Sequence, residues 1–162
     1  MTGELPSPAM ACMFLAAGAM LFLGLAYREF IIRFCKGANL WMAVLTFVGV
    51  AFSAGIFIGL CWSDKYYVAV LSAIGWSMAF LFFAFRGLRA KYTAARAVLL
   101  GLAAIALTMT VWSRPTVALM CAIAVPSILE YGIKGGREKL SDKIISLSSF
   151  AAVLICGAGA VM

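Results

Sequence analysis

Long apolar runs separated by short charged gaps make up most of this 162-residue chain. Each run approaches the roughly 20 residues that an α-helix needs to cross a bilayer. Backbone N–H and C=O groups surrounded by hydrocarbon must be satisfied within their own segment, so such runs predict helices. The expected helices cover residues 8–27, 40–62, 66–85, 92–112, 116–133 and 144–162.

Two stretches leave alternatives open. Residues 28–39 (REFIIRFCKGAN) either continue the first helix with their charges reaching the surface, or lie flat in the interface as an amphipathic segment. The fourth and fifth apolar runs are short for a span. They either extend far enough to cross, or form a re-entrant hairpin whose tip, near Arg114, lies at membrane depth.

Composition supports a bilayer as the natural solvent of the chain. Hydrophobic residues make up 65% and charged residues 12%, and the mean hydropathy is +1.08. A soluble domain carries about 25% charged residues. We therefore expect one all-α, polytopic integral membrane domain over residues 1–162, with the lipid bilayer as its main partner.

The distribution of lysine and arginine predicts an orientation. Eleven of the thirteen lie in three gaps, 28–36, 86–96 and 134–143, whereas the two other gaps hold only Lys65 and Arg114. Basic residues concentrate on the cytoplasmic side of membrane proteins. The prediction is six transmembrane helices in a plasma or inner membrane, with both termini on the non-cytoplasmic side.

This orientation makes a direct prediction for the 86–96 loop. In intact cells or sealed vesicles, a proteolysis or cysteine-labelling map should find the loop on the cytoplasmic side, because it holds the densest group of basic residues. A map that places the loop outside would overturn the predicted orientation.

Two stripes of small residues are candidate helix-packing interfaces. Small side chains spaced four residues apart let helix backbones approach closely in lipid. Such stripes pack either inside one subunit or between subunits, so the expected partners are further copies of this chain or other membrane subunits. The stripes are Ala51, Gly55 and Gly59 in the second apolar run, and Ser148, Ala152, Cys156 and Ala160 in the last.

Three residues are candidates for a gate or an ion contact. Pro126 cannot donate to the carbonyl of Ala122, and the carboxylate of Glu130 follows four residues later. Arg114, between two short runs, could face an anion at a hairpin tip. The simpler alternatives are a kinked helix ending in an interfacial glutamate, and an ordinary turn outside the membrane. Serine and threonine hydroxyls within the runs are expected to bond back to their own helices, with a hydroxyl-lined pore as the alternative.

The basic stretch 86–96 is a candidate contact for anionic lipid headgroups or an acidic partner. On one continuous helix Arg86, Arg89 and Arg96 would fall within about 80° of each other. The alternative is a topology anchor with no further role.

Enzyme chemistry finds little support in the residue types present. The chain has no histidine, and its five cysteines form no C-x-x-C pair. We expect no catalytic residues, no cofactor, no metal site and no nucleic-acid partner. The expected role is non-enzymatic, in an oligomeric channel or transport assembly. The alternatives are a structural subunit of a larger membrane complex of the secretion, conjugation or respiratory type, or a hole-forming lysis protein.

Overall fold

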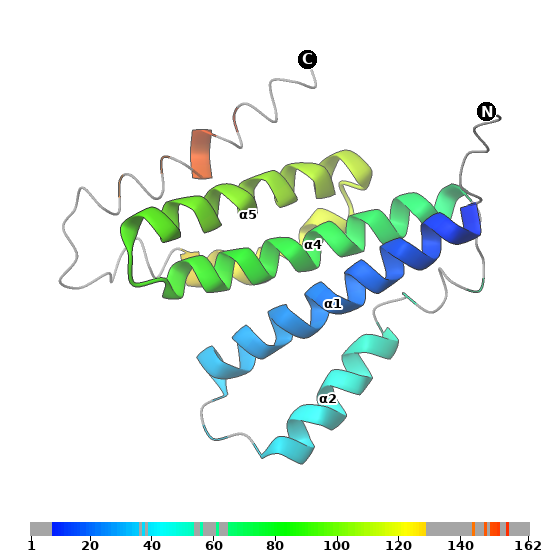
Figure 1. The fold of residues 1–162 in the computed structure, drawn as a ribbon, viewed down its shortest axis with the longest axis horizontal. Helices are drawn as coiled ribbons and strands as arrows, with labels where there is room; N and C mark the ends of the chain where they lie inside the picture. The colour runs from blue at the N-terminus through cyan, green and yellow to red at the C-terminus, as the bar shows by residue number, and fades with distance from the viewer. Residues whose placement is uncertain are drawn as a thin grey trace, which may run out of the picture.

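The computed structural model describes residues 8–35, 37, 39–53, 56, 61, 65–128, 144, 148, 150–152 and 155. Within these residues the chain is helical and contains no strand. The elements, in order, are α1 (Pro8–Phe34), α2 (Leu40–Ser53), α4 (Lys65–Arg89), α5 (Thr93–Ser113) and the 3-10 helix η1 (Val117–Ala124), shown in Figure 1. The all-helical class predicted from the apolar runs is therefore confirmed for the described residues.

Three of the helices are long and apolar enough to cross a membrane. They cover Ala9–Phe34, Tyr66–Arg89 and Thr93–Ser113. The fourth apolar run, which looked short in the sequence, thus forms a helix of full membrane length. Two shorter apolar helices cover Leu40–Ser53 and Val117–Ile128.

The charged segment after the first apolar run belongs to α1. This helix continues without a break through Glu29 to Phe34, 27 residues in all. At 1.5 Å per residue it is about 40 Å long, longer than the roughly 30 Å hydrocarbon layer. Of the two arrangements expected for this segment, the structure has the helical extension, because Phe30 and Phe34 pack on Phe85 of α4 and hold the extension against the bundle.

α4 lies between α1 and α5 (Figure 1). α1 and α4 run in the same direction, because Ala19 lies beside Gly75 and Glu29 beside Arg86. α5 runs back along α4 in the opposite direction. Since α1 ends beside the end of α4, α4 begins at the opposite end of the bundle from the end of α1. α2 follows α1 and runs antiparallel to it.

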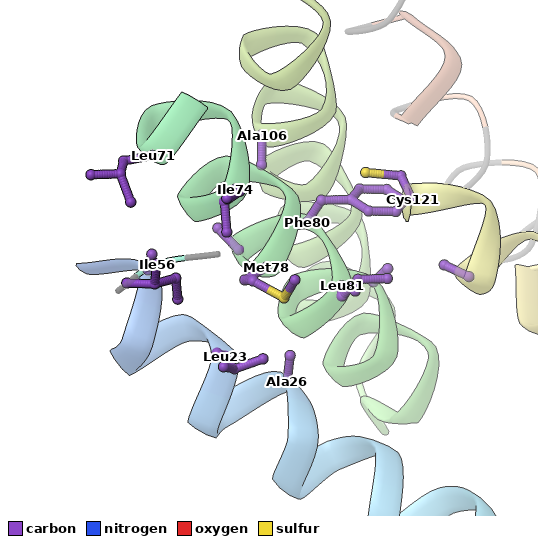
Figure 2. Close-up of a cluster of buried hydrophobic side chains, with 14 of the residues drawn as sticks. Leu23, Ala26, Ile56, Leu71, Ile74, Met78, Phe80, Leu81, Ala106 and Cys121 are labelled. Atoms are coloured by element: carbon purple, nitrogen blue, oxygen red, sulfur yellow. The ribbon is translucent and has the colours of Figure 1, made fainter. Parts of the chain in front are cut away.

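The contact between α1 and α4 is made by small side chains. Buried residues of α1 recur at spacings of four and three, as in helices that pack almost parallel. They are Cys12, Ala16, Ala19, Leu23 and Ala26. On α4, a Cβ at Gly75 would lie only 3.7 Å from the Cβ of Ala19. Figure 2 shows Leu23 and Ala26 directed toward Met78 and Leu81.

The contact between α4 and α5 is closer still near the turn that joins them. A Cβ at Gly87 would lie 3.3 Å from side-chain atoms of Leu99 and Leu100. Farther along, Phe80 lies near Ala106 of α5 and Cys121 of η1 (Figure 2). α4 is thus packed on two sides by its neighbours, and its buried residues form the centre of the hydrophobic core.

The fifth predicted helix differs from the expected α-helix. Its first turns are 3-10, with the N–H groups of Val117, Ala118 and Leu119 donating to carbonyls three residues earlier. Eight residues is long for a 3-10 helix. Prolines at 115 and 126 flank the segment, and each lacks the N–H that a continuous α-helical ladder would need. An α-helical turn follows at residues 125–128.

Replacing Gly75 with leucine tests the close approach of α1 and α4. The added side chain meets Ala19, so the helices must separate, and we expect a loss of about 1–3 kcal/mol in unfolding free energy. Thermal unfolding in a fixed detergent would measure this change. The matched control is Gly101→Leu on α5, where a Cβ meets nothing within 4 Å. Equal stability of the two variants would contradict the packing described.

Candidate functional site

A buried carboxylate pairs with two arginines where α1 and α4 end together. Glu29 is only 4% exposed. Arg86 Nη1 donates to Glu29 Oε1 at 3.0 Å, and Arg89 Nη1 donates to Oε2 at 3.1 Å. The arginine side chains are 54% and 51% exposed. We call this group the Glu29 cluster; it carries a net charge of +1, with the positive charge on its outer side.

The helices themselves explain how the cluster forms. Arg86 and Arg89 are three residues apart in the last turn of α4, so they project from the same side, and cations are favoured at a helix C-terminus. Glu29 comes from the part of α1 that extends beyond the apolar run. A carboxylate buried without a partner would cost several kcal/mol, so its two arginines tie α1 to α4.

Arg96 is separate from this cluster. α4 ends at Arg89 and α5 begins at Thr93, so the three arginines do not share the face of one continuous helix. Arg96 is 4% exposed, and its Nη2 donates to the carbonyl oxygen of Ala90 at 2.6 Å. The structure does not bring the three arginines to one face: Arg86 and Arg89 bond Glu29, whereas Arg96 bonds the turn between α4 and α5. Their contact with lipid or an acidic partner stays a prediction.

Arg114 lies at the opposite end of α4. Its guanidinium carbon is 4.0 Å from the ring centroid of Tyr66, and its Nη1 donates to the Tyr66 hydroxyl at 3.2 Å. Cation–π stacking and a hydrogen bond thus hold the turn after α5 against the first turn of α4. The turn that carries Arg114 therefore lies level with the start of α4.

The candidate gate around Pro126 has a different backbone from the one expected. The carbonyl of Ala122, which Pro126 cannot bond, accepts the N–H of Val125 instead. A role of this segment as a gate or an ion contact stays a prediction. Pro126 itself is exposed. Glu130, the carboxylate expected to work with it, lies outside the described residues.

The two small-residue stripes are described only in part. Ala51 is buried and belongs to the hydrophobic core, so this member of the first stripe packs within the chain. Ser148 and Ala152 are exposed helical residues. The other members, Gly55, Gly59, Cys156 and Ala160, lie outside the described residues.

The hydroxyl groups bond mainly to their own helices. Ser77 donates to the carbonyl of Ala73, and Thr110 donates to that of Ala106. Thr46, Ser53 and Thr108 also donate to carbonyls three or four residues earlier. Ser72 and Ser113 instead join α4 to α5. In the described part of the chain, these hydroxyls bond to backbone carbonyls or to a neighbouring helix, and the structure does not bring them together on a common polar surface.

The sequence alone did not identify Glu29 as a site residue. A signal was present, because Glu29 is the sole acidic residue between Glu4 and Asp64. No groups of three or more His, Cys, Asp or Glu side chains that could hold a metal ion occur among the described residues. These contacts hold neighbouring segments against both ends of α4. Glu29 of α1 pairs at one end, and Arg114, in the turn after α5, packs on the other.

The chain is thus a bundle of apolar helices with charged contacts at both ends. No family model, curated protein or solved structure matches it. The inferences about its role therefore rest on its own residues and geometry.

Removing both arginines of the Glu29 cluster should destabilise the bundle strongly. Arg86→Ala or Arg89→Ala alone leaves one arginine on the carboxylate, and we expect each to cost about 1 kcal/mol. The double variant leaves Glu29 buried without either, and we expect a loss of about 3 kcal/mol, more than the sum of the single variants. Unfolding in detergent would measure the three values.

Lys91→Ala is the control for this cycle, because Lys91 is exposed in the turn after α4 and carries the same charge. We expect it to change the unfolding free energy by less than about 0.5 kcal/mol. Strict additivity of the two arginine variants would refute the shared role of Arg86 and Arg89.

Proposed function

We propose that the protein is an integral membrane protein whose helices α1, α4 and α5 cross the bilayer. The spacing of its charged contacts supports this placement. Tyr66 and Arg86 are twenty residues apart on α4, so the Arg114–Tyr66 contact and the Glu29 cluster lie about 30 Å apart along the helix. That distance equals the typical thickness of the hydrocarbon layer, roughly 30 Å. Each charged contact then lies at one surface.

The course of the chain supports a second crossing by residues 40–62. α1 and α4 run in the same direction, so the connection between them must pass from one surface to the other. α2 starts this return and is apolar throughout its described length. The positive-inside rule assigns the surface with the Glu29 cluster to the cytoplasm, and both termini to the opposite side of a plasma or inner membrane.

Within the membrane, we propose a non-catalytic role as a structural subunit of a larger assembly. The observation that carries this proposal is the use of the buried polar groups: Glu29 ties α1 to α4, while Ser77 and Thr110 bond to their own helices. A conducting path needs polar groups directed toward water or a passing solute. In a channel built from this chain, such a path would therefore run between copies rather than through the described bundle.

The face of α2 directed away from α1 is the proposed contact surface for a partner helix. Trp41, Leu45, Val48 and Phe52 are exposed at spacings of four, three and four, which places them on one stripe of the helix. In Figure 1, α2 lies beside α1, with no other labelled helix on the side of α2 away from α1. The described turns are short, so helix faces provide most of the surface available for recognition.

Mass analysis of the native complex tests this role. The tagged protein would be extracted from its own membrane in mild detergent and analysed by native gel and native mass spectrometry. We expect other subunits in fixed ratio, giving a mass that is not a multiple of 17.3 kDa. A homo-oligomer that conducts a solute in liposomes would overturn the structural role and support the channel.

A pair of matched variants locates the contact. Leu45→Ala with Phe52→Ala removes bulk from the α2 stripe, and we expect partner subunits to be lost by about tenfold or more, as when a packed interface loses two large side chains. Val98→Ala with Ile105→Ala removes exposed apolar bulk from α5 and should leave the complex intact. Equal loss in both pairs would argue against an interface on α2.

A further inference from the structure

An apolar groove lies between the cluster end of α1 and the start of α2. Its volume is about 450 Å³, within the range of sites that bind small ligands. Ile31 and Ile32 of α1 and Leu40 and Val44 of α2 line it, and Arg28 is its single charged lining residue. The groove is therefore lined mainly by apolar side chains, with the guanidinium group of Arg28 as its one charged group.

The two helices are held in a way that keeps the groove open. The Tyr27 hydroxyl donates to the carbonyl of Ala43 at 2.8 Å and also bonds Thr46. The ring of Phe47 lies 3.9 Å from the position that a Cβ on Gly24 would occupy. These contacts join α1 to α2, and four of the residues that make them, Gly24, Tyr27, Ala43 and Phe47, also line the groove.

Arg28 lies at the depth of lipid headgroups in the proposed membrane placement. It follows Pro8 by twenty residues, so it is about 30 Å along the helix, at the edge of the hydrocarbon layer. Its neighbour Glu29 is buried against α4, where it pairs with Arg86 and Arg89. Glu29 is the sole acidic residue among the described ones, so the charge beside the groove is positive and available to an anion.

We propose that this groove binds an anionic glycerophospholipid, with one acyl chain along Ile31, Ile32, Leu40 and Val44 and the phosphate on Arg28. The apolar lining matches the chain, and the exposed guanidinium matches the phosphate, which it can bind through two parallel N–H donors. The lipid would fill the space between α1 and α2 and fix their angle. This inference rests on the proposed membrane placement but not on the proposed assembly role.

Lipid retention by the purified protein tests the site. The full chain would be transferred into nanodiscs of mixed phosphatidylglycerol and phosphatidylcholine, released, and analysed by native mass spectrometry. We expect one phosphatidylglycerol to be retained in preference to phosphatidylcholine. Arg28→Gln should reduce that retention about fivefold, the effect of one cation on an anionic headgroup. The matched control Arg33→Gln changes an arginine of the same helix that does not line the groove.

A second variant tests acyl-chain binding in the groove separately from the charge of Arg28. Val44→Trp fills the groove from α2 and should reduce retention of both lipids, while Arg28→Gln affects only the anionic one. Equal retention of the two lipids by the unmodified protein, unchanged binding after Arg28→Gln, or a second protein copy in place of lipid would each overturn the proposal.

Extraction with alkaline carbonate shows whether a negative result refutes the lipid site alone or the membrane placement as well. A protein that stays in the carbonate-resistant membrane but retains no phosphatidylglycerol refutes the lipid site alone. A protein that carbonate releases refutes the membrane placement and the lipid site together.

Discussion

The close approach of α4 to its two neighbours is the constraint on which the bundle depends. In lipid, helices gain little from hydrophobicity by associating, so van der Waals contact and a few polar bonds must hold them together. Ala19 against Gly75 brings α1 to α4, and Gly87 against Leu99 and Leu100 brings α5 to the other side. Larger residues at these positions would separate the helices and weaken every contact along them.

Charged residues add directional contacts to the close packing of the small residues, and these contacts lie at the two ends of α4. Glu29 with Arg86 and Arg89 closes one end, and Arg114 on Tyr66 closes the other. Between them, the buried hydroxyls bond within their own helices. The polar groups thus lie where water or headgroups can solvate their outer atoms, so the bundle obtains directional contacts without charges in the middle of its apolar layer.

Helix class and the approximate extent of α1, α4 and α5 follow from the sequence, because an apolar run of membrane length has few structural solutions. The packing contacts were harder to predict. Small residues are so common in the first run that the stripe through Ala16 and Ala19 does not stand out, whereas the spaced glycines at 55 and 59 do. Whether these glycines form an interface stays a prediction.

The charged contacts were missed for a related reason. The predicted helices 66–85 and 92–112 left residues 86–91 between them, so the sequence did not show that α4 continues through Arg86 to Arg89. The shared face of the three arginines was expected only if one helix ran through the whole stretch. Tertiary packing separates the three arginines: the chain turns after Arg89, α5 packs closely on Gly87, and Arg96 of α5 bonds the turn through the carbonyl of Ala90. Glu29 also needs its partners in space, since Arg86 is 57 residues away in the sequence.

That separation has a consequence for biosynthesis. A ribosome adds about 5–20 residues per second, so Arg86 emerges roughly 3–11 s after Glu29. During this interval the Glu29 carboxylate has neither of its arginine partners from α4. The ion pair closes only after α4 has arrived in the same direction as α1. A chain in which α4 packs against α1 in the opposite direction would leave Glu29 without Arg86 and Arg89, so this ion pair forms only in the parallel arrangement of the two helices.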